Sequence, residues 1–540
     1  MRLPASLRTM TNPAAMVTLD DTSVLISDVF EVHARTQPDK EAVVCGAVRR
    51  CWGEFNANIN RVANALAQQG IGPGCQVAVL MGNAVEMLEV VFGIVKAGAC
   101  VVPLSGLLTG EQLATLIDDS DAVMLFATPD FSARLGEHRA DCPKLRPDGC
   151  ISVFHTLPGW QPFEAFLAHP DSRGTQTPLA NCHASLPFNI IYSSGTTGLP
   201  KGIVQTHRVR THWAMFTALE QGFNEHSRAL TTTALYSNGT WLVMLPALFV
   251  GGTCVVMPAF DPGEFLATVQ RERISHSFMV PAQFLMVLSH PGFDGFDTSS
   301  LHNLLCAGSP LRRDTKREVL RRFGNKLTEL YGFSEGFAAM LKPHQHAERF
   351  DSVGRPALGF EARILDDAGN VLPPGELGEI AGYGAGIMSG YHRRPEQTAA
   401  LVWRDERGRS FIRSGDLGRV DAQGFITLVD RKKDMIISGG FNVFPTDIEA
   451  VVGQHPDVLD VTVIGIPHDK WGETVLALVI RRPGATTDVE VLMAWANQRL
   501  ARHQRLSTLA FRDDFPRNAL GKVLKRLLRE PYWAAAGRVM

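Results

Sequence analysis

The chain has 540 residues, of which 45% are hydrophobic, so it is long enough to bury large cores in several domains. Its 53 Lys and Arg against 55 Asp and Glu leave a formal charge of -2, which argues against a nucleic-acid-binding protein and against a disordered acidic chain. The 9 cysteines are scattered without a C-x-x-C pair, which indicates reduced core thiols in a cytoplasmic protein and not a disulfide framework or a zinc site.

Two segments could bear on targeting. Residues 1–22 contain no continuous apolar stretch followed by a cleavage site, so we expect a loose N-terminal arm and no secretory signal. Residues 229–260 carry no charged side chain, but Pro246, Pro258 and a glycine pair interrupt the roughly 20 apolar residues that a spanning helix needs. We therefore predict a buried helix, a turn and a strand there, with a membrane span as the weaker alternative.

Helical patterns alternate with short apolar runs from residue 23 onwards. Helices are predicted over residues 55–69, 84–96 and 111–119, and strands over residues 76–80, 100–103 and 122–126. Strands separated by helices of this length are typical of βαβ units, which build a mainly parallel sheet covered on both faces. The polar, proline-rich residues 128–187 predict a surface connection.

The alternation then resumes. Strands are predicted over residues 188–192, 228–234, 253–257, 275–280 and 304–306, and helices over residues 262–273 and 312–323. Beyond residue 351, short alternating runs with frequent glycine predict an antiparallel, barrel-like part, and the charge cluster at residues 430–434 marks the last boundary. The predicted fold class is α/β, with an N-terminal domain (23–432) of βαβ-type sheets plus the barrel-like part, and a small α+β C-terminal domain (433–540).

The stretch SSGTTGLPKG, residues 193–202, follows a predicted strand. Its glycines let the backbone turn tightly and approach a ligand, while its hydroxyls and Lys201 supply donors for an anion. Gly202 follows the lysine where the Walker loop has a hydroxyl, so a P-loop kinase or GTPase is disfavoured. The pattern predicts a phosphate-binding loop. Further on, Glu335 is a lone carboxylate in a glycine- and aromatic-rich turn, which suits either a magnesium ligand or a solvated acid.

Four more motifs accompany this loop, and together they carry a resemblance. They are YGFSE at 331–335, SGDLG at 414–418, DRKKDMIISGGFNVFPTDIE at 430–449 and NALGKVLKR at 518–526. Their order and spacing resemble the acyl-adenylate-forming superfamily over nearly the whole chain from about residue 23, and within it most of all the free-standing fatty acyl- and 4-coumarate-type acid-CoA ligases. The resemblance implies a ligase that uses ATP, Mg2+ and coenzyme A on a small-molecule carboxylic acid.

The resemblance also implies roles for the nucleotide-binding residues. The loop would hold the β- and γ-phosphates of ATP, with Thr196 and Lys201 acting on the charge that shifts as pyrophosphate leaves. Glu335 would bind magnesium. The remaining nucleotide contacts implied by the resemblance are Ser193, Ser194, Gly195, Thr197, Gly198, Gly308, Ser309, Pro310, Tyr331, Gly332, Ser334, Asp416 and Arg431.

The C-terminal motifs imply a mobile small domain. Lys522 matches the lysine that reaches the carboxylate and the α-phosphate during adenylation, and Lys433 matches the hinge about which the small domain rotates. Gly439 and Gly440 would line the path of coenzyme A in the other orientation. The basic neighbours of Lys522 are expected to form an ordinary solvated surface: Arg517, Lys525, Arg526 and Arg529.

The acid pocket is the least informative part of the sequence. The resemblance places it beside Tyr236, Ser237, Trp241 and Phe333. Many relatives carry a histidine or another aromatic residue where this chain has Ser237, so the role of a gate or base does not transfer to Ser237. Because residues 229–260 contain no charge, an apolar fatty or aryl acid is favoured over a dicarboxylate or an amino acid.

Alternatives to acyl-CoA formation remain at this point. An acyl-AMP ligase could deliver to a separate carrier protein, and a non-catalytic regulator could keep the fold, although binding alone would not need Lys522 on a second domain. Nothing in the sequence argues for an oxidative, light-emitting fate of the adenylate. A homodimer is possible.

Overall fold

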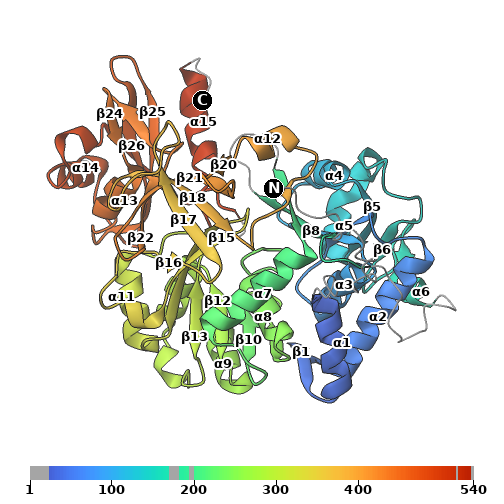
Figure 1. Ribbon diagram of the computed structural model, residues 1–540. Coiled ribbons are helices and arrows are strands. Elements are labelled where there is room, and N and C mark those ends of the chain that lie inside the picture. The colour runs from blue at the N-terminus through green and yellow to red at the C-terminus, as the bar shows by residue number, and fades with distance from the viewer. Residues whose placement is uncertain (1–23, 169–181, 194–199, 519–520, 537–540) are drawn as a thin grey trace, which may run out of the picture.

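The computed structural model describes residues 24–168, 182–193, 200–518 and 521–536. Two large sheets form its N-terminal part (Figure 1). In the first sheet, the strands from β8 to β7 run parallel, whereas β9 pairs antiparallel with both of its neighbours, β8 and β19. In spatial order the strands are β19 (Gly390–Tyr391), β9 (Lys201–Thr206), β8 (Pro187–Ser193), β4 (Cys100–Pro103), β3 (Gln76–Leu80), β5 (Ala122–Ala127), β6 (Cys150–Ser152) and β7 (Gln161–Pro162).

The second sheet has nine strands, and its interior is parallel from β14 to β1. Since parallel strands end at the same edge, the loops after β10, β13 and β14 open on one side of the sheet. In spatial order the strands are β16 (Arg355–Pro356), β15 (Phe337–Leu341), β14 (Leu327–Phe333), β13 (Asn303–Cys306), β12 (His276–Met279), β10 (Arg228–Thr231), β11 (Thr253–Val256), β1 (Glu41–Cys45) and β2 (Val48–Cys51).

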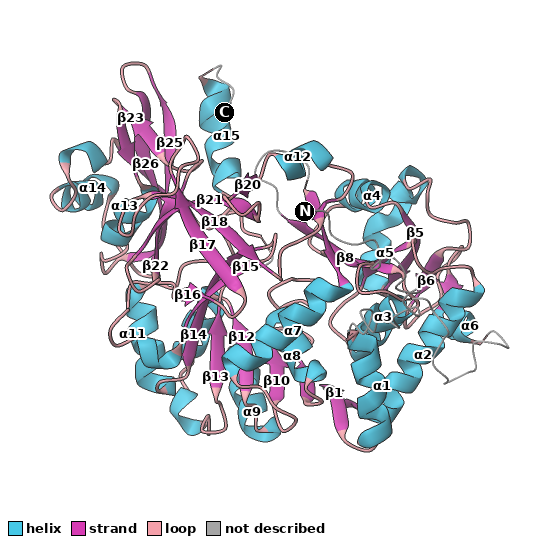
Figure 2. Ribbon diagram, in the orientation of Figure 1, coloured by secondary structure: helices cyan, strands magenta, loops and turns pink. Residues whose placement is uncertain are grey.

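Helices cover these sheets, and α7 and α8 lie between the two halves of the N-terminal part (Figure 2). The helix α3 is almost wholly buried, which fits a helix packed between other elements. The helices of this part are α1 (Ile26–Thr36), α2 (Trp52–Gln68), α3 (Val85–Lys96), α4 (Gly110–Asp119), α5 (Pro129–Leu135), α6 (Phe163–Leu167), α7 (His207–Gln221), α8 (Trp241–Phe249), α9 (Pro262–Glu272), α10 (Pro281–Leu288), α11 (Arg313–Phe323) and α12 (Pro395–Ala399).

Two smaller antiparallel-rich sheets follow (Figure 1, yellow to red). The first contains β17 (Phe360–Leu365), β18 (Gly378–Gly384), β21 (Ser410–Val420), β20 (Val402–Arg404) and β22 (Ile426–Arg431). The second contains β24 (Phe441–Val443), β23 (Ile436–Ser438), β26 (Gly472–Arg481), β25 (Val458–His468) and β27 (Thr508–Phe511), with helices α13 (Pro445–Val452), α14 (Val489–Asn497) and α15 (Lys525–Ala535). The predicted fold class, an α/β protein with a barrel-like part and a small C-terminal domain, is confirmed.

One prediction about a connecting segment is wrong. Residues 128–187 are not only a surface connection, because β6 and β7 extend the first sheet and α5 and α6 lie beside them. The short run at Cys150–Ser152 is buried at every position, but it is too brief, among prolines, to stand out as a strand in the sequence.

The uncharged segment at 229–260 folds as predicted into a helix, a turn and a strand. Pro246 lies inside α8 and lacks the N–H that would bond the carbonyl of Leu242. Gln221, at the end of α7, takes the place of that donor, since its Nε2 donates to the Leu242 carbonyl at 3.1 Å. Across the described residues, we find no helix with the length and apolar character needed to cross a membrane.

Candidate active site

Three loops with predicted site residues leave the same edge of the second sheet. They follow β10, β13 and β14, and the tip between β14 and β15 carries Ser334 and Glu335. Gly332 is required there, because a Cβ atom would lie 2.4 Å from the carbonyl oxygen of Phe337. After β13, Gly308 has φ +96° and leads into Ser309 and Pro310. The fold thus gathers motifs that lie far apart in the chain.

The phosphate loop is described only at its two ends. Ser193 ends β8 and pairs in register with Lys201 at the start of β9. The residues Ser194, Gly195, Thr196, Thr197 and Gly198 lie outside the described residues, so their roles stay predictions.

Tyr391 contacts both Glu335 and Lys201, two described residues that are predicted to act on magnesium and phosphate. Its hydroxyl donates to Glu335 Oε1 at 2.5 Å, and the Lys201 Nζ atom lies 4.9 Å from the centre of its ring. Burial and the adjacent Glu335 carboxylate raise the pKa of Tyr391, so its hydroxyl keeps its proton and remains a donor. Sequence reasoning missed Tyr391, because nothing in its own segment signals a contact with a hairpin 56 residues earlier.

Asp416 is held by two partners. The Tyr331 hydroxyl donates to Asp416 Oδ2 at 2.8 Å, and the Arg431 Nε atom lies 3.3 Å from Oδ1. The ring of Tyr331 packs edge-on against Phe337, with 6.3 Å between ring centroids. The three residues from YGFSE, SGDLG and DRKKD therefore form one cluster. Their contacts with adenine and ribose remain predictions.

Lys522 lies in a tight turn beside this cluster. Its main-chain N donates to Asn518 Oδ1 at 2.9 Å, and the preceding Gly521 has φ +72°. Burial and then the charge of Arg431 lower the pKa of Lys522 to about 7, against the opposing effect of Asp416. The small domain therefore presents Lys522 to the large one.

Lys433 belongs to the same electrostatic environment. Burial and then the charge of Arg431 lower its pKa to about 8, and Lys201 acts in the same direction. Four cations from three parts of the fold, Lys201, Arg431, Lys433 and Lys522, therefore influence one another. Lys201, Arg431 and Lys522 are half-buried and Lys433 is exposed, and together these cations are a donor set suited to a polyphosphate.

The predicted coenzyme A path has a special backbone. Gly439 has φ +58° and Gly440 has φ +84°, which favour glycine. No atom lies within 4 Å of a Cβ built on Gly440, so the space there is open in this orientation of the small domain. The open space is compatible with the predicted role and does not test it.

The expectation of a solvated basic surface near Lys522 is wrong for two residues. Lys525 is half-buried and forms an ion pair with Glu449 at 2.8 Å, and the half-buried Arg529 donates to the carbonyl of Lys433 at 3.1 Å. Arg517 and Arg526 are exposed as expected, although Arg517 also pairs with Asp460 at 2.5 Å. Because these partners come from β25, α13 and the segment around Lys433, no local pattern revealed them.

The predicted acid-pocket residues differ in burial. Trp241 is buried and donates from its Nε1 to the carbonyl of Leu235 at 2.7 Å, and Ser237 is also buried. Tyr236 and Phe333 are half-buried, and Phe333 stacks on Phe337 with 5.5 Å between ring centroids. Sequence reasoning missed a cation at this place, because Arg210 reaches the segment from α7.

A metal would find few protein ligands here. Within the described ranges, no group of three or more His, Cys, Asp or Glu side chains could hold a metal ion. Glu335 alone is compatible with Mg2+, which is usually bound through one or two carboxylates together with substrate phosphates.

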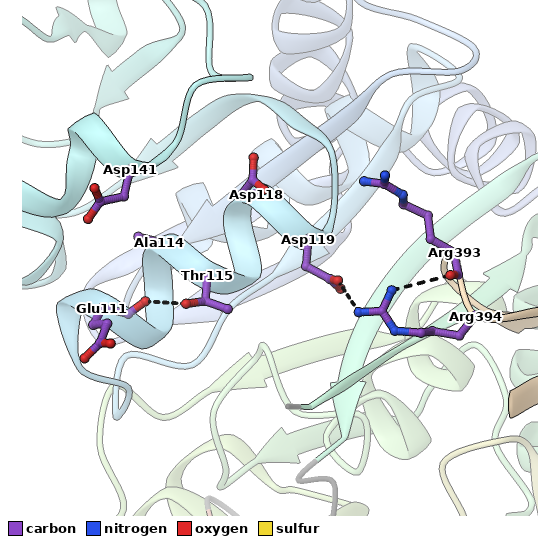
Figure 3. A pocket seen from close by; sticks show the side chains of 8 residues that line it. All are labelled: Glu111, Ala114, Thr115, Asp118, Asp119, Asp141, Arg393 and Arg394. Atoms are coloured by element: carbon purple, nitrogen blue, oxygen red, sulfur yellow. Dashed lines mark hydrogen bonds and ion pairs between the residues drawn. The ribbon is translucent and has the colours of Figure 1, made fainter. Parts of the chain in front are cut away.

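A polar pocket of about 600 Å³ opens on the surface between α4 and the segment before α12 (Figure 3). The Arg394 guanidinium pairs there with Asp119 at 2.6 Å. None of the predicted site residues lines it. The lining residues are Glu111, Ala114, Thr115, Asp118, Asp119, Asp141, Arg393 and Arg394.

Known proteins resemble this chain over nearly its full length. Feruloyl-CoA synthase of Amycolatopsis sp is 34% identical over 93% of this chain and 97% of its own. The indoleacetate–CoA ligase of Aromatoleum aromaticum is 32% identical over 94% and 98%. The crystal structure of ATP-bound MatB from Rhodopseudomonas palustris superimposes with a TM-score of 0.83 at 28% identity, covering 94% of this chain and 99% of that one.

Two family models match as well. The model described as AMP-binding enzyme matches residues 30–392, and the model of the AMP-binding enzyme C-terminal domain matches residues 447–522. The chain therefore belongs to the AMP-binding, acyl-adenylate-forming family and is an AMP-forming acyl-CoA ligase family enzyme.

Proposed function

We propose that this protein joins an aryl carboxylic acid to coenzyme A in two half-reactions through an acyl-adenylate. The observation that carries the proposal is the gathering of Lys201, Arg431, Lys433 and Lys522 near Asp416. Lys201 also lies 4.9 Å from the ring centre of Tyr391, whose hydroxyl donates to Glu335. A carboxylate oxygen would attack the α-phosphorus of ATP with loss of pyrophosphate, and the coenzyme A thiol would then attack the acyl carbon with loss of AMP.

The described residues fit this chemistry through positioning and charge. Lys201 and Lys433 would offset the negative charge of the departing pyrophosphate, and Lys522 would reduce the repulsion between the carboxylate and the α-phosphate. Asp416 presents acceptor oxygens suited to the ribose hydroxyls. A Mg2+ ion, held by Glu335 and phosphate oxygens, would supply further neutralisation of phosphate charge.

We place the domain boundary at residues 432 and 433 and assign rotation of the small domain to Lys433. In the orientation described, Lys522 lies with Asp416 and Arg431, which fits the adenylation half-reaction. A second orientation would bring Gly439 and Gly440 to the thiol-bearing substrate. Hinges need only a few residues that can absorb a backbone change. The nine free cysteines support a cytoplasmic protein.

An aryl acid is favoured over a fatty acid by the names of two relatives, a feruloyl-CoA synthase and an indoleacetate–CoA ligase. Two aromatic side chains predicted for the pocket, Trp241 and Phe333, agree with this choice, because rings pack well against rings.

Pyrophosphate release with ferulate, indoleacetate and octanoate, with and without coenzyme A, tests the proposal. We expect release with an aromatic acid and a thioester only when coenzyme A is present. Release without a coenzyme A thioester would favour delivery to a carrier protein. No release with any acid would favour a non-catalytic regulator.

A further inference from the structure

Arg210 is a fully buried arginine on α7, with 0% of its surface exposed. Two neutral side chains accept from its guanidinium. The Nε atom donates to Asn189 Oδ1 at 2.6 Å, and the Nη2 atom donates to Asn238 Oδ1 at 2.9 Å. Both partners are amides, so neither compensates the positive charge.

The third nitrogen of this guanidinium has no partner. Arg210 Nη1 is buried and donates no hydrogen bond, and no carboxylate among the described residues acts on the charge of Arg210. The guanidinium carbon lies 4.4 Å from the ring centre of Trp241 and 5.7 Å from that of Trp213. A cation–π contact offsets only part of the free-energy cost of burying an uncompensated charge. The site is therefore one at which an anion would be strongly stabilised.

The place of Arg210 connects two parts of the predicted site. Asn238 lies in the loop after β10, directly after Ser237 of the expected acid pocket. On the other side, Asn189 Nδ2 donates to Gln205 Oε1 at 3.3 Å, and Gln205 Nε2 donates to the carbonyl of Ser334 at 3.4 Å. A chain of hydrogen bonds thus runs from Arg210 to the YGFSE turn.

We propose that Arg210 binds the carboxylate of the acid substrate through Nη1. This inference rests on the proposed function and adds a second cation to its chemistry. Arg210 belongs to the large domain, so it can hold the acid before Lys522 arrives. In the dry surroundings of Trp241 a charge-assisted hydrogen bond is strong. Arg210 on α7 thus supplies the positive charge that residues 229–260 lack, and the rest of the acid can be apolar.

Separate measurement of the two half-reactions distinguishes carboxylate binding by Arg210 from a purely structural role. The carboxylate loses its negative charge when the adenylate forms, so only the first half-reaction needs an anion-binding group. We expect Arg210→Met and Arg210→Gln to raise the KM for the acid about 10- to 100-fold, the range for hydrogen bonds to charged groups. The KM for ATP and the rate of thioester formation from supplied acyl-AMP should change less than about 2-fold, because neither depends on binding a free carboxylate.

The acid used is the member of the panel, ferulate, indoleacetate or octanoate, that the unchanged protein adenylates fastest. Its primary amide serves as a competitive inhibitor without a carboxylate charge, and its inhibition constant should not change in Arg210→Met. Arg210→Lys should restore part of the affinity for the acid, because it keeps a cation. The matched control is Arg208→Gln, two residues earlier on α7 and exposed.

Three results would overturn the inference while leaving the proposed function intact. The acid KM could stay unchanged in both Arg210 variants. The rates of both half-reactions could fall together, as expected if Arg210 only stabilises the packing of α7 against β8. The loss could be confined to acids with a ring hydroxyl, which would place a different oxygen at Nη1. If the unchanged protein released no pyrophosphate with any acid, the proposed function itself would be wrong.

Discussion

The affinity for ATP should depend on pH because of the charged side chains around Lys522. The pKa of Lys522 is lowered to about 7 and that of Lys433 to about 8, by burial and then by Arg431. A bound polyphosphate favours the ammonium forms, so binding takes up protons at a pH above these values. We expect the affinity for ATP to fall as the pH rises from about 7 to 9. Calorimetry in buffers of different ionisation enthalpy measures the proton uptake directly.

Lys522→Met should remove a large part of that uptake. Lys144→Met is the control, because its hydrogen bond to Asp121 raises the pKa of Lys144 and keeps it outside this pH window. Equal proton uptake by the unchanged protein and by Lys522→Met would show that Lys522 does not titrate on binding.

At the scale of single elements, α8 depends on a side chain from α7. Pro246 leaves the Leu242 carbonyl without its usual helical donor, and Gln221 Nε2 supplies one at 3.1 Å. Gln221→Ala should therefore destabilise the protein by about 1–3 kcal/mol, the cost of an unsatisfied buried carbonyl. The midpoint of the urea transition that includes the N-terminal part measures this loss.

A double-mutant cycle supplies the control. Pro246→Ala restores a main-chain N–H four residues after Leu242, so Gln221→Ala should cost less in that background. A coupling of about 1 kcal/mol fits two residues that share one carbonyl. Identical costs in both backgrounds would mean that the Gln221 hydrogen bond does not replace the missing helical donor.

At the scale of the whole molecule, the two half-reactions should respond to different residues. Lys522→Ala should lower adenylation about 10²- to 10³-fold, as expected for a group that stabilises transition-state charge. Thioester formation from supplied acyl-AMP should be largely retained, because that step needs the other domain orientation. Single-turnover assays of each half-reaction measure the two effects. If both fall equally in Lys522→Ala, the rotation account is wrong.

Gly440 should show the reverse behaviour, but its backbone complicates the test. At φ +84° any side chain costs about 1–2 kcal/mol of backbone strain, whatever its size. Gly440→Ala and Gly440→Trp should therefore be compared, with Gly424→Ala as the control, since Gly424 has φ +85° and equally open space. Obstruction of the coenzyme A path predicts a far greater loss of thioester formation with Trp than with Ala. Equal losses would indicate strain alone.

An ion-pair bridge joins the domains in this orientation. Asp460 on β25 pairs with Arg312, which follows Gly308, Ser309 and Pro310 closely in the chain, and with Arg517 at 2.5 Å. Arg312 Nη1 also donates to the carbonyl of Leu459 at 3.0 Å. The arginines are partly exposed, so the bridge is expected to be weak and sensitive to salt.

Asp460→Asn should accordingly lower adenylation about two- to five-fold at low salt, with little effect at high salt. Asp457→Asn is the control, because Asp457 bonds Thr487 within the small domain. The ratio of the two half-reaction rates across a salt series is the measurement. A ratio that Asp460→Asn leaves unchanged at low salt would show that the bridge does not bias the orientation.

The sequence determined the order of the elements and the motifs. The βαβ alternation follows from hydrophobic periodicity within short windows, and α3 and β3 appear within about one residue of their predicted bounds. Lys201 and Glu335 were predicted from the residue types of their own segments, which suit phosphate and magnesium. The roles of Asp416, Arg431 and Lys522 were implied by the resemblance of their motifs to the acyl-adenylate-forming superfamily, and all five roles stay predictions.

Only the tertiary structure decided the contacts between distant segments. Tyr391 with Glu335, Asp460 with two arginines, and Arg210 with Asn189 and Asn238 each join residues from different elements. No window of sequence encodes such pairs, because they depend on how the sheets and helices pack. The apolar composition of residues 229–260 correctly predicted a buried helix, turn and strand, because composition is a local property. The position of Arg210 beside this segment depends on the packing of α7, so only the folded structure reveals it.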